Sequence, residues 1–316
     1  MKTITMKKTI LALALVAGLT SFAGNAKAQS HNFTTLNNPD AGGGGTLITG
    51  ISGSTIVGIY IDSNYRYNGF TYNGSAFTPL NNPNGVNGTY IRGISGSTIV
   101  GYYFDSDYIA RGFTYNESTF TTLNDPNSAG PTYITGISGS TIVGYSENSN
   151  FLPQGFTYNG SAFTPWNNPN GVNGTFIEGI SGSTIFGSYL DSNFTPRGFT
   201  YNGSTFTTLN NDPNGVNGTY IKGISESTIV GEMIDSTYTR SGFIYNGAFE
   251  TLNDPIAVNG TYITGISGGT IVGYSIDNNY RFNGFIASAV PEPSTYALLG
   301  IGAIGLLMVL RKKKTA

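Results

Sequence analysis

Few residues in this chain could carry out chemistry. His31 is the only histidine, and the chain contains no cysteine. Thiolate nucleophiles and disulfides are therefore excluded, and a zinc site built from His and Cys is not expected. Carboxylates remain as the groups that could act as a general acid or base. We therefore expect no catalytic residues, no metal and no cofactor, and predict that the protein is not an enzyme.

The best candidate for a binding site is a set of polar residues that differ between otherwise similar segments. Each directly precedes a Gly-Ile-Ser triplet, and the set is Thr49, Arg92, Thr135, Glu178, Lys222 and Thr264. Its charged members, Arg92, Glu178 and Lys222, could hold a sugar if they line a channel. The alternative is drift on a solvated surface. Glu178 is the only acid in the set, so the paired acids of a glycosidase are not expected.

Acidic residues and arginines recur together in a second pattern. The expected pairs are Asp62 with Arg66, Asp105 with Arg111, Asp191 with Arg197, Asp235 with Arg240, and Asp277 with Arg281. Ion pairs across a hairpin explain this pattern simply. The alternative is a calcium-binding rim, best represented by Asp105-Ser106-Asp107, but the neighbouring arginines would oppose a cation.

The composition is that of an all-β protein. Only 10% of the 316 residues are charged, against about 25% in an average protein, whereas 45 are glycine and 13% are aromatic. Residues 29–290 contain seven basic and sixteen acidic residues, a net charge of −9. This acidic body argues against nucleic acid or an anionic membrane surface as the partner.

Internal repeats organise most of the chain. Gly-Ile-Ser begins at residues 50, 93, 136, 179, 223 and 265, a spacing of 42 to 44 residues. The second copy contains four expected strands, at 89–94, 98–104, 112–115 and 119–123, and Asn-Gly pairs such as Asn73-Gly74 favour type I′ turns between the third and fourth strands. Four antiparallel strands in about 43 residues are typical of a β-propeller blade. The repeated aromatic residues are expected to pack between blades rather than to bind ligand.

The ends of the repeat region indicate a closed ring. A fourth-strand motif, Phe33-Thr34-Thr35-Leu36-Asn37, precedes the first complete copy, and the last copy stops after its third strand. We therefore predict a six-bladed β-propeller in which residues near 31–37 pair beside 284–288 and complete the last blade. An open β-solenoid is the alternative, but it would not need the displaced strand.

Both termini have the features of targeting segments. Residues 1–28 combine a lysine-bearing start, an apolar run and the small-x-small site Ala26-Lys27-Ala28, so they are predicted to be a secretory signal peptide rather than a buried helix. Residues 290–316 contain Pro291, Glu292 and Pro293, then the apolar run 296–310, then a basic cluster. Fifteen helical residues span about 22 Å, short for a bilayer core of about 30 Å. We expect a single transmembrane helix there and a propeller domain over residues 29–289.

The C-terminal segment resembles the PEP-CTERM sorting signal of exported bacterial proteins, in its Pro-Glu-Pro motif, short apolar run and basic end. The resemblance implies recognition by a membrane exosortase, transient anchoring in the inner membrane, and removal of the tail near Pro291–Pro293. It also implies release to the cell surface or extracellular matrix of a Gram-negative bacterium. A plain single-span anchor is the alternative reading of hydropathy alone.

The repeat units resemble the HAF-type extracellular repeats found in many PEP-CTERM proteins. Gly-Phe-Thr-Tyr, Phe-Thr-x-Leu and Gly-Ile-x-x-x-x-Ile-Val-Gly carry the resemblance over residues 31–288, although Arg111-Gly112-Phe113 stands where that family has His-Ala-Phe. No enzymatic role comes with that family. We expect an exported structural or interaction protein of the cell surface or biofilm polysaccharide matrix. The alternative is a lectin-like, carbohydrate-binding propeller.

Overall fold

The computed structural model describes residues 30–128, 130–209 and 215–290. The predicted signal peptide with Ala26 and Ala28 lies outside the described residues, as do Pro291–Pro293 and the predicted transmembrane helix. Within the described ranges every regular element is a strand, and no helix is long and apolar enough to cross a membrane. Residues Asn32–Ser288 form one compact unit, and the rest of the chain is assigned to a second.

The strands repeat in groups of four, as the sequence spacing predicts. The first strands are β2 (Gly45–Ser52), β6 (Thr89–Ser95), β10 (Thr132–Ser138), β14 (Thr175–Ser181), β18 (Gly218–Ser225) and β22 (Thr261–Ser267). The second strands are β3 (Thr55–Ile61), β7 (Thr98–Phe104), β11 (Thr141–Glu147), β15 (Thr184–Leu190), β19 (Thr228–Ile234) and β23 (Thr270–Ile276). The third strands are β4 (Tyr67–Tyr72), β8 (Ala110–Asn116), β12 (Pro153–Tyr158), β16 (Pro196–Tyr201), β20 (Arg240–Tyr245) and β24 (Phe282–Ala289). The fourth strands are β5 (Phe77–Pro79), β9 (Thr119–Thr122), β13 (Phe163–Trp166), β17 (Phe206–Thr208) and β21 (Phe249–Leu252), and β1 (His31–Thr35) precedes the first group.

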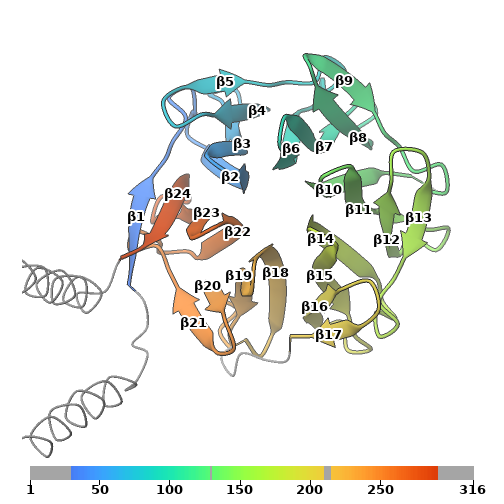
Figure 1. The fold of residues 1–316 in the computed structure, drawn as a ribbon. Coiled ribbons are helices and arrows are strands. Elements are labelled where there is room, and N and C mark those ends of the chain that lie inside the picture. The colour runs from blue at the N-terminus through green and yellow to red at the C-terminus, as the bar shows by residue number, and fades with distance from the viewer. Residues whose placement is uncertain (1–29, 129, 210–214, 291–316) are drawn as a thin grey trace, which may run out of the picture. The chain divides into compact units, whose positions relative to one another are not determined.

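These strands form antiparallel sheets arranged around a central axis, which is the architecture of a β-propeller (Figure 1). Four sheets contain four strands each, in the orders β6-β7-β8-β9, β10-β11-β12-β13, β14-β15-β16-β17 and β18-β19-β20-β21. A further sheet contains eight strands, because a single parallel pair between Gly45 and Phe282 joins β2 to β24. The first strand of each group lies nearest the axis (Figure 1).

The N-terminal strand pairs with the last repeat, which confirms the predicted closure. Strand β1 pairs with β24, and the amide of Leu36 donates to the carbonyl of Gly284 at 2.8 Å. The rings of Phe33 and Phe285 meet edge to face with centroids 5.2 Å apart. Since an unpaired strand edge invites association with other chains, this pairing protects β24.

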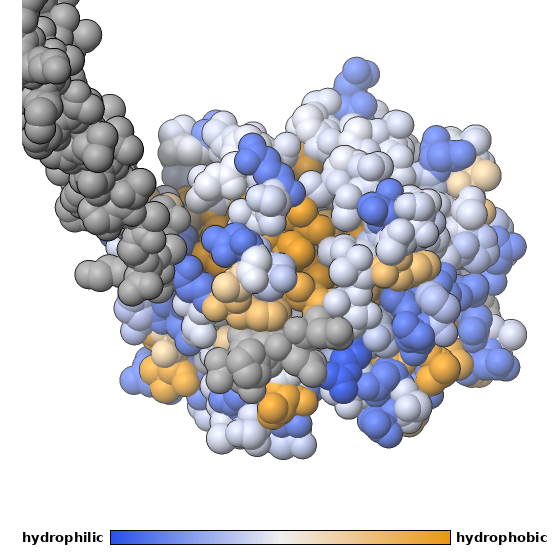
Figure 2. All heavy atoms as spheres, turned by 60° about the horizontal axis from the view of Figure 1, so that its bottom comes forward, coloured by the Kyte–Doolittle hydropathy of each residue, from blue (hydrophilic) through white to orange (hydrophobic). Residues whose placement is uncertain are grey.

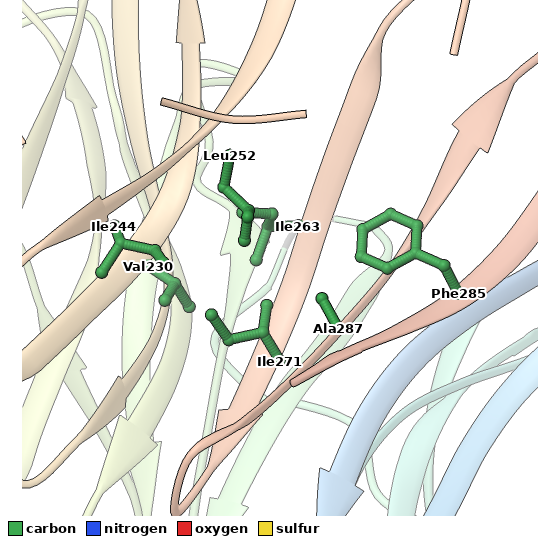
Figure 3. Close-up of a cluster of buried hydrophobic side chains, with 7 residues drawn as sticks. All are labelled: Val230, Ile244, Leu252, Ile263, Ile271, Phe285 and Ala287. Carbon is green, nitrogen blue, oxygen red and sulfur yellow. The ribbon is translucent and has the colours of Figure 1, made fainter. Parts of the chain in front are cut away.

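The hydrophobic core lies between neighbouring groups of strands. Figure 3 shows one such cluster, formed by side chains of β19 to β24: Val230, Ile244, Leu252, Ile263, Ile271, Phe285 and Ala287. The phenylalanine of each Gly-Phe pair is almost fully buried, at Phe70, Phe113, Phe156, Phe199, Phe243 and Phe285. The glycine of the pair makes room for an isoleucine of the next group: a Cβ on Gly112 would lie 2.7 Å from Cδ1 of Ile134. These repeated residues therefore pack neighbouring sheets together, as the sequence predicts.

The turns between third and fourth strands differ from the sequence expectation. A type I′ turn needs positive φ at both central residues. Gly74 has φ of +96°, but Asn73 is not among the described residues with positive φ. Instead, the side-chain oxygen of Asn73 accepts hydrogen bonds from the amides of Ser75 at 3.0 Å and Ala76 at 2.9 Å. The prediction of type I′ geometry was wrong because this asparagine caps a longer loop with its side chain.

Candidate functional site: the central channel

Every first strand contains a β-bulge at the residue before Gly-Ile-Ser. In β6, Ile91 pairs with Gly101 and Gly93 pairs with Val100, so Arg92 is left without a partner in the ladder. The same shift occurs in β2, β10, β14, β18 and β22. A bulge redirects a side chain relative to the regular pleat. The bulge explains why this single position can vary within an otherwise uniform strand.

The six bulge residues line one cavity on the axis, with a volume of about 410 Å³. Arg92, Glu178 and Lys222, which the sequence singles out, are therefore brought together in one place. The Gly-Ile-Ser segments also line the cavity. Their glycines permit close approach between first strands, since a Cβ on Gly136 would lie 2.9 Å from the Cα of Gly179.

The three threonines at the bulges connect neighbouring first strands. Their hydroxyls donate to backbone carbonyls of the next strand: Thr49 to Ile91 at 2.7 Å, Thr135 to Ile177 at 2.8 Å and Thr264 to Ile48 at 2.9 Å. These bonds occupy the hydroxyl protons. The threonines therefore hold neighbouring first strands together, and the hydrogen-bond donors that the set can offer a ligand are Arg92 and Lys222.

The charged members of the set make contacts with other residues that line the channel. Lys222 lies 2.9 Å from Glu178, which joins β18 to β14. Arg92 donates to the hydroxyl of Tyr102 at 3.1 Å, and its guanidinium lies 5.4 Å from the centroid of that ring. Arg92 is nevertheless exposed to the channel. Positive and negative groups thus lie in the same cavity.

Glu232 is a second acid that lines the channel, although Glu178 remains the only acid of the six-residue set. It lies on β19, at a place where β7, β11 and β23 carry a tyrosine, and it is only 4% exposed. Arg240 donates to its carboxylate at 2.8 Å. Burial raises the pKa of Glu232, while Lys222 and Arg240 oppose that shift. The replacement of a tyrosine by Glu232 in one copy is the sequence signal that could have placed this acid in the channel.

The acidic turns between second and third strands satisfy their carboxylates internally. One carboxylate oxygen of Asp105 accepts from the amides of Asp107 and Ile109, both at 2.9 Å, and the other accepts from Arg111 at 2.9 Å. No group of three or more potential metal ligands occurs in the part of the chain that the structure describes. At Asp105 this geometry favours the ion-pair interpretation over the calcium rim.

Only two of the five expected Asp–Arg pairs are ion pairs among the described residues, Asp105–Arg111 and Asp191–Arg197. Arg240 pairs with Glu232 instead of Asp235. In the remaining turns an asparagine amide takes the place of arginine, from Asn68 to Asp62 and from Asn283 to Asp277, both at 3.2 Å. The prediction failed there because spacing in sequence does not fix which side chain crosses the hairpin.

The channel can form many hydrogen bonds with a ligand. Tyr102, Tyr145 and Tyr274 line it beside the charged groups. Burial raises the pKa of Tyr145 and Tyr274, so their hydroxyls stay protonated and can donate at neutral pH. The cationic donors Arg92 and Lys222, the tyrosine hydroxyls and the two carboxylates together suit a ligand rich in hydroxyl groups.

Comparison with known proteins identifies a sorting signal at residues 289–313 and solved structures of similar fold. Residues 289–313 match the PEP-CTERM protein-sorting motif, which points to an exported protein of Gram-negative bacteria that exosortase sorts from a transient membrane anchor. None of the curated proteins matches the chain. The match does not extend into the repeats, so their HAF-type resemblance stays a prediction.

The solved structures to which the chain is similar include two proteins at low sequence identity. One is an arginine-to-alanine mutant of AofleA from Arthrobotrys oligospora, with 11% identity, a TM-score of 0.52, and coverage of 84% of this chain and 92% of that one. The other is SapL1 lectin in complex with alpha methyl fucoside, with 17% identity, a TM-score of 0.53, and coverage of 78% and 97%. At these identities the similarity supports the fold alone.

Proposed function

We propose that the protein is an exported, non-enzymatic interaction protein that binds the extracellular polysaccharide matrix after exosortase has released it from the membrane. The observation that carries this proposal is the position of the sorting motif. The motif begins at residue 289, where the last strand, β24, ends. Cleavage near Pro291–Pro293 would therefore release the complete ring and discard only the anchor.

The ring itself has six blades in this proposal. The eight-stranded sheet consists of two four-stranded groups joined by one residue pair, so it counts as two blades beside the four separate sheets. The HAF-type repeat unit would then correspond to one blade.

The polar groups near the channel argue for binding rather than catalysis. Each channel acid lies within 2.9 Å of a cation, Glu178 of Lys222 and Glu232 of Arg240. Residues 265–269 have the Gly-x-Ser-x-Gly spacing of a nucleophile elbow, which in hydrolases connects a strand to a helix. Here they form the end of β22 and a hairpin turn into β23, and Ser267 accepts a hydrogen bond from the amide of Gly53 at 3.2 Å.

The export and matrix parts of the proposal can be tested in a producing bacterium by fractionation. The wild-type chain should appear in the extracellular polysaccharide fraction, shortened at its C-terminus. A Glu292→Ala variant should remain in the membrane at full length, because the Pro-Glu-Pro motif is altered. A full-length wild-type chain confined to the membrane would contradict the proposal. Release of reducing ends from polysaccharide by the purified protein would contradict its non-enzymatic part.

A lectin-like function of the channel is the second candidate. The mixed-charge cavity favours it, and the structurally similar SapL1 lectin binds alpha methyl fucoside. Under this candidate, Arg92→Ala and Lys222→Ala should abolish saturable binding of small saccharides, with methyl fucoside as the first probe. Unchanged binding in both variants would exclude the channel as the sugar site.

A further inference from the structure

Six exposed aromatic side chains occupy the same position in the six repeats. They lie in the loops between second and third strands, and they are 67% to 78% exposed: Tyr65, Tyr108, Phe151, Phe194, Tyr238 and Tyr280. Their rings make no contact with another aromatic ring in the part of the chain that the structure describes. The expectation that repeated aromatic residues pack between blades therefore fails for this set, although it holds for the buried phenylalanines.

The backbone at these positions is strained for an aromatic residue. All six have left-handed φ angles, between +58° and +63°. In the first repeat, the amide of Tyr65 donates to the carbonyl of Asp62, and the amide of Asp62 donates to the carbonyl of Arg66, each at 3.0 Å. This is a three-residue hairpin loop whose last residue must be left-handed, a position that glycine or asparagine fills at lower cost.

Neither packing nor the turn thus requires an aromatic ring, yet all six repeats place one there. Residues held in unfavourable conformations gather at functional sites, where the strain is tolerated for the sake of the side chain. A role other than stabilising the fold accounts for an aromatic side chain at a position where it strains the backbone.

The surroundings of the six rings combine polar residues with isolated apolar ones. In four repeats an exposed valine precedes an asparagine whose side-chain amide donates to the aspartate just before the aromatic loop, as from Asn87 to the carbonyl of Asp105 at 2.6 Å. The valines are Val86, Val172, Val216 and Val258. Each aromatic residue directly follows two exposed polar residues, as Tyr65 follows Ser63 and Asn64. Figure 2 shows hydrophobic residues in several patches among hydrophilic ones on the face it displays.

We propose that the six aromatic loop residues together form a multivalent docking surface for a neutral polysaccharide chain. Separate flat rings bordered by hydrogen-bonding groups can stack against sugar faces, whereas a protein partner would favour a continuous apolar patch. The net charge of −9 over residues 29–290 disfavours polyanions such as nucleic acid. One weak site per blade gives strong binding to a polymer through avidity. The inference rests on the proposed function and assigns its binding surface.

The test uses residues 30–290, which contain the complete ring, in native gels cast with hydroxyethyl cellulose or with the purified extracellular polysaccharide of the producing bacterium. The test variant replaces all six aromatic residues by glycine, which suits the left-handed conformation. The matched control is Glu226→Gly, because Glu226 is also exposed and left-handed, at φ +54°, but lies at the other end of β19 from Tyr238. A second variant with asparagine at all six positions serves if the glycine variant does not fold.

We expect wild type and control to be retarded in the gels, and the glycine variant to bind at least tenfold more weakly with an unchanged or higher thermal midpoint. If the glycine variant were retarded as strongly as wild type, this inference would be overturned. The proposed function would then stand, with the channel as the site. Failure of wild type to be retarded by either polysaccharide would overturn both. Glycine-sensitive binding to neutral lipid vesicles without polysaccharide binding would assign the surface to a membrane instead.

Discussion

One carboxylate organises each acidic turn, and its protonation state should therefore affect stability. The guanidinium of Arg111 and the amide of Ile109 hold the pKa of Asp105 below its usual range, and the amide of Arg281 does the same for Asp277. The pKa values of Asp62, Asp191 and Asp235 are also lowered. A carboxyl whose pKa is lower in the folded state stabilises the fold above its unfolded pKa, near pH 4, and loses that contribution as the pH falls further.

The natural comparison is the third repeat, in which Asn148 replaces the aspartate and still accepts amide hydrogen bonds from Asn150 at 2.9 Å and Leu152 at 3.1 Å. We expect the thermal midpoint of wild type to fall as the pH is lowered from about 5 to about 2. In a variant with asparagine in place of the aspartate at the other five turns, the thermal midpoint should fall less steeply over that range. Parallel curves for the two proteins would show that these carboxylates do not couple to folding.

At this scale the sequence predicted types of residue better than contacts. The six residues of the variable polar set line one cavity, and the sequence had singled out its three charged members. The structural role of its threonines was not predicted, because their hydrogen bonds run to the neighbouring repeat. The pairing of Arg240 with Glu232 was missed for a different reason: both lie in the same hairpin, but Asp235 is nearer to Arg240 in the sequence. Six left-handed aromatic residues could have been noticed as a repeat, but not as strained or exposed.

At the scale of elements, the strands follow directly from alternating β-branched and aromatic residues between turn signals. The expected 98–104 strand is β7 as observed, and other boundaries in that copy differ by only one or two residues. The bulges were not predicted, because an extra residue in one strand leaves no mark in composition. They matter nonetheless, since they direct the variable residues to the channel.

Strand β1 should contribute strongly to stability because it closes the ring. Deletion of residues 30–37 should lower the thermal midpoint and cause concentration-dependent association, since the edge of β24 would be exposed. A synthetic peptide of residues 30–38 added in trans should restore the midpoint. The milder variant Phe33→Ala removes the contact with Phe285 and should cost about 3 kcal/mol or somewhat less, as Phe33 is only partly buried. A deleted chain that stays monomeric with an unchanged midpoint would contradict the closure.

At the scale of the molecule, six similar segments can bury their apolar faces only against one another. The repeated Gly-Phe pairs and the inner-strand isoleucines supply that packing, so the propeller architecture was predictable from one chain. The displaced first strand made closure predictable as well. The ligand was not predictable. The residues that would select it are the channel residues that differ between repeats and the exposed aromatic loop residues, and packing constrains neither set.

Titration calorimetry of residues 30–290 with the purified extracellular polysaccharide of the producing bacterium tests the proposed function most directly. We predict a saturable heat of binding that is unaffected by calcium, because the aspartates of the turns are already bonded within the protein. Absence of any binding heat over a range of temperatures would contradict a matrix-binding role and leave the repeats as a scaffold alone.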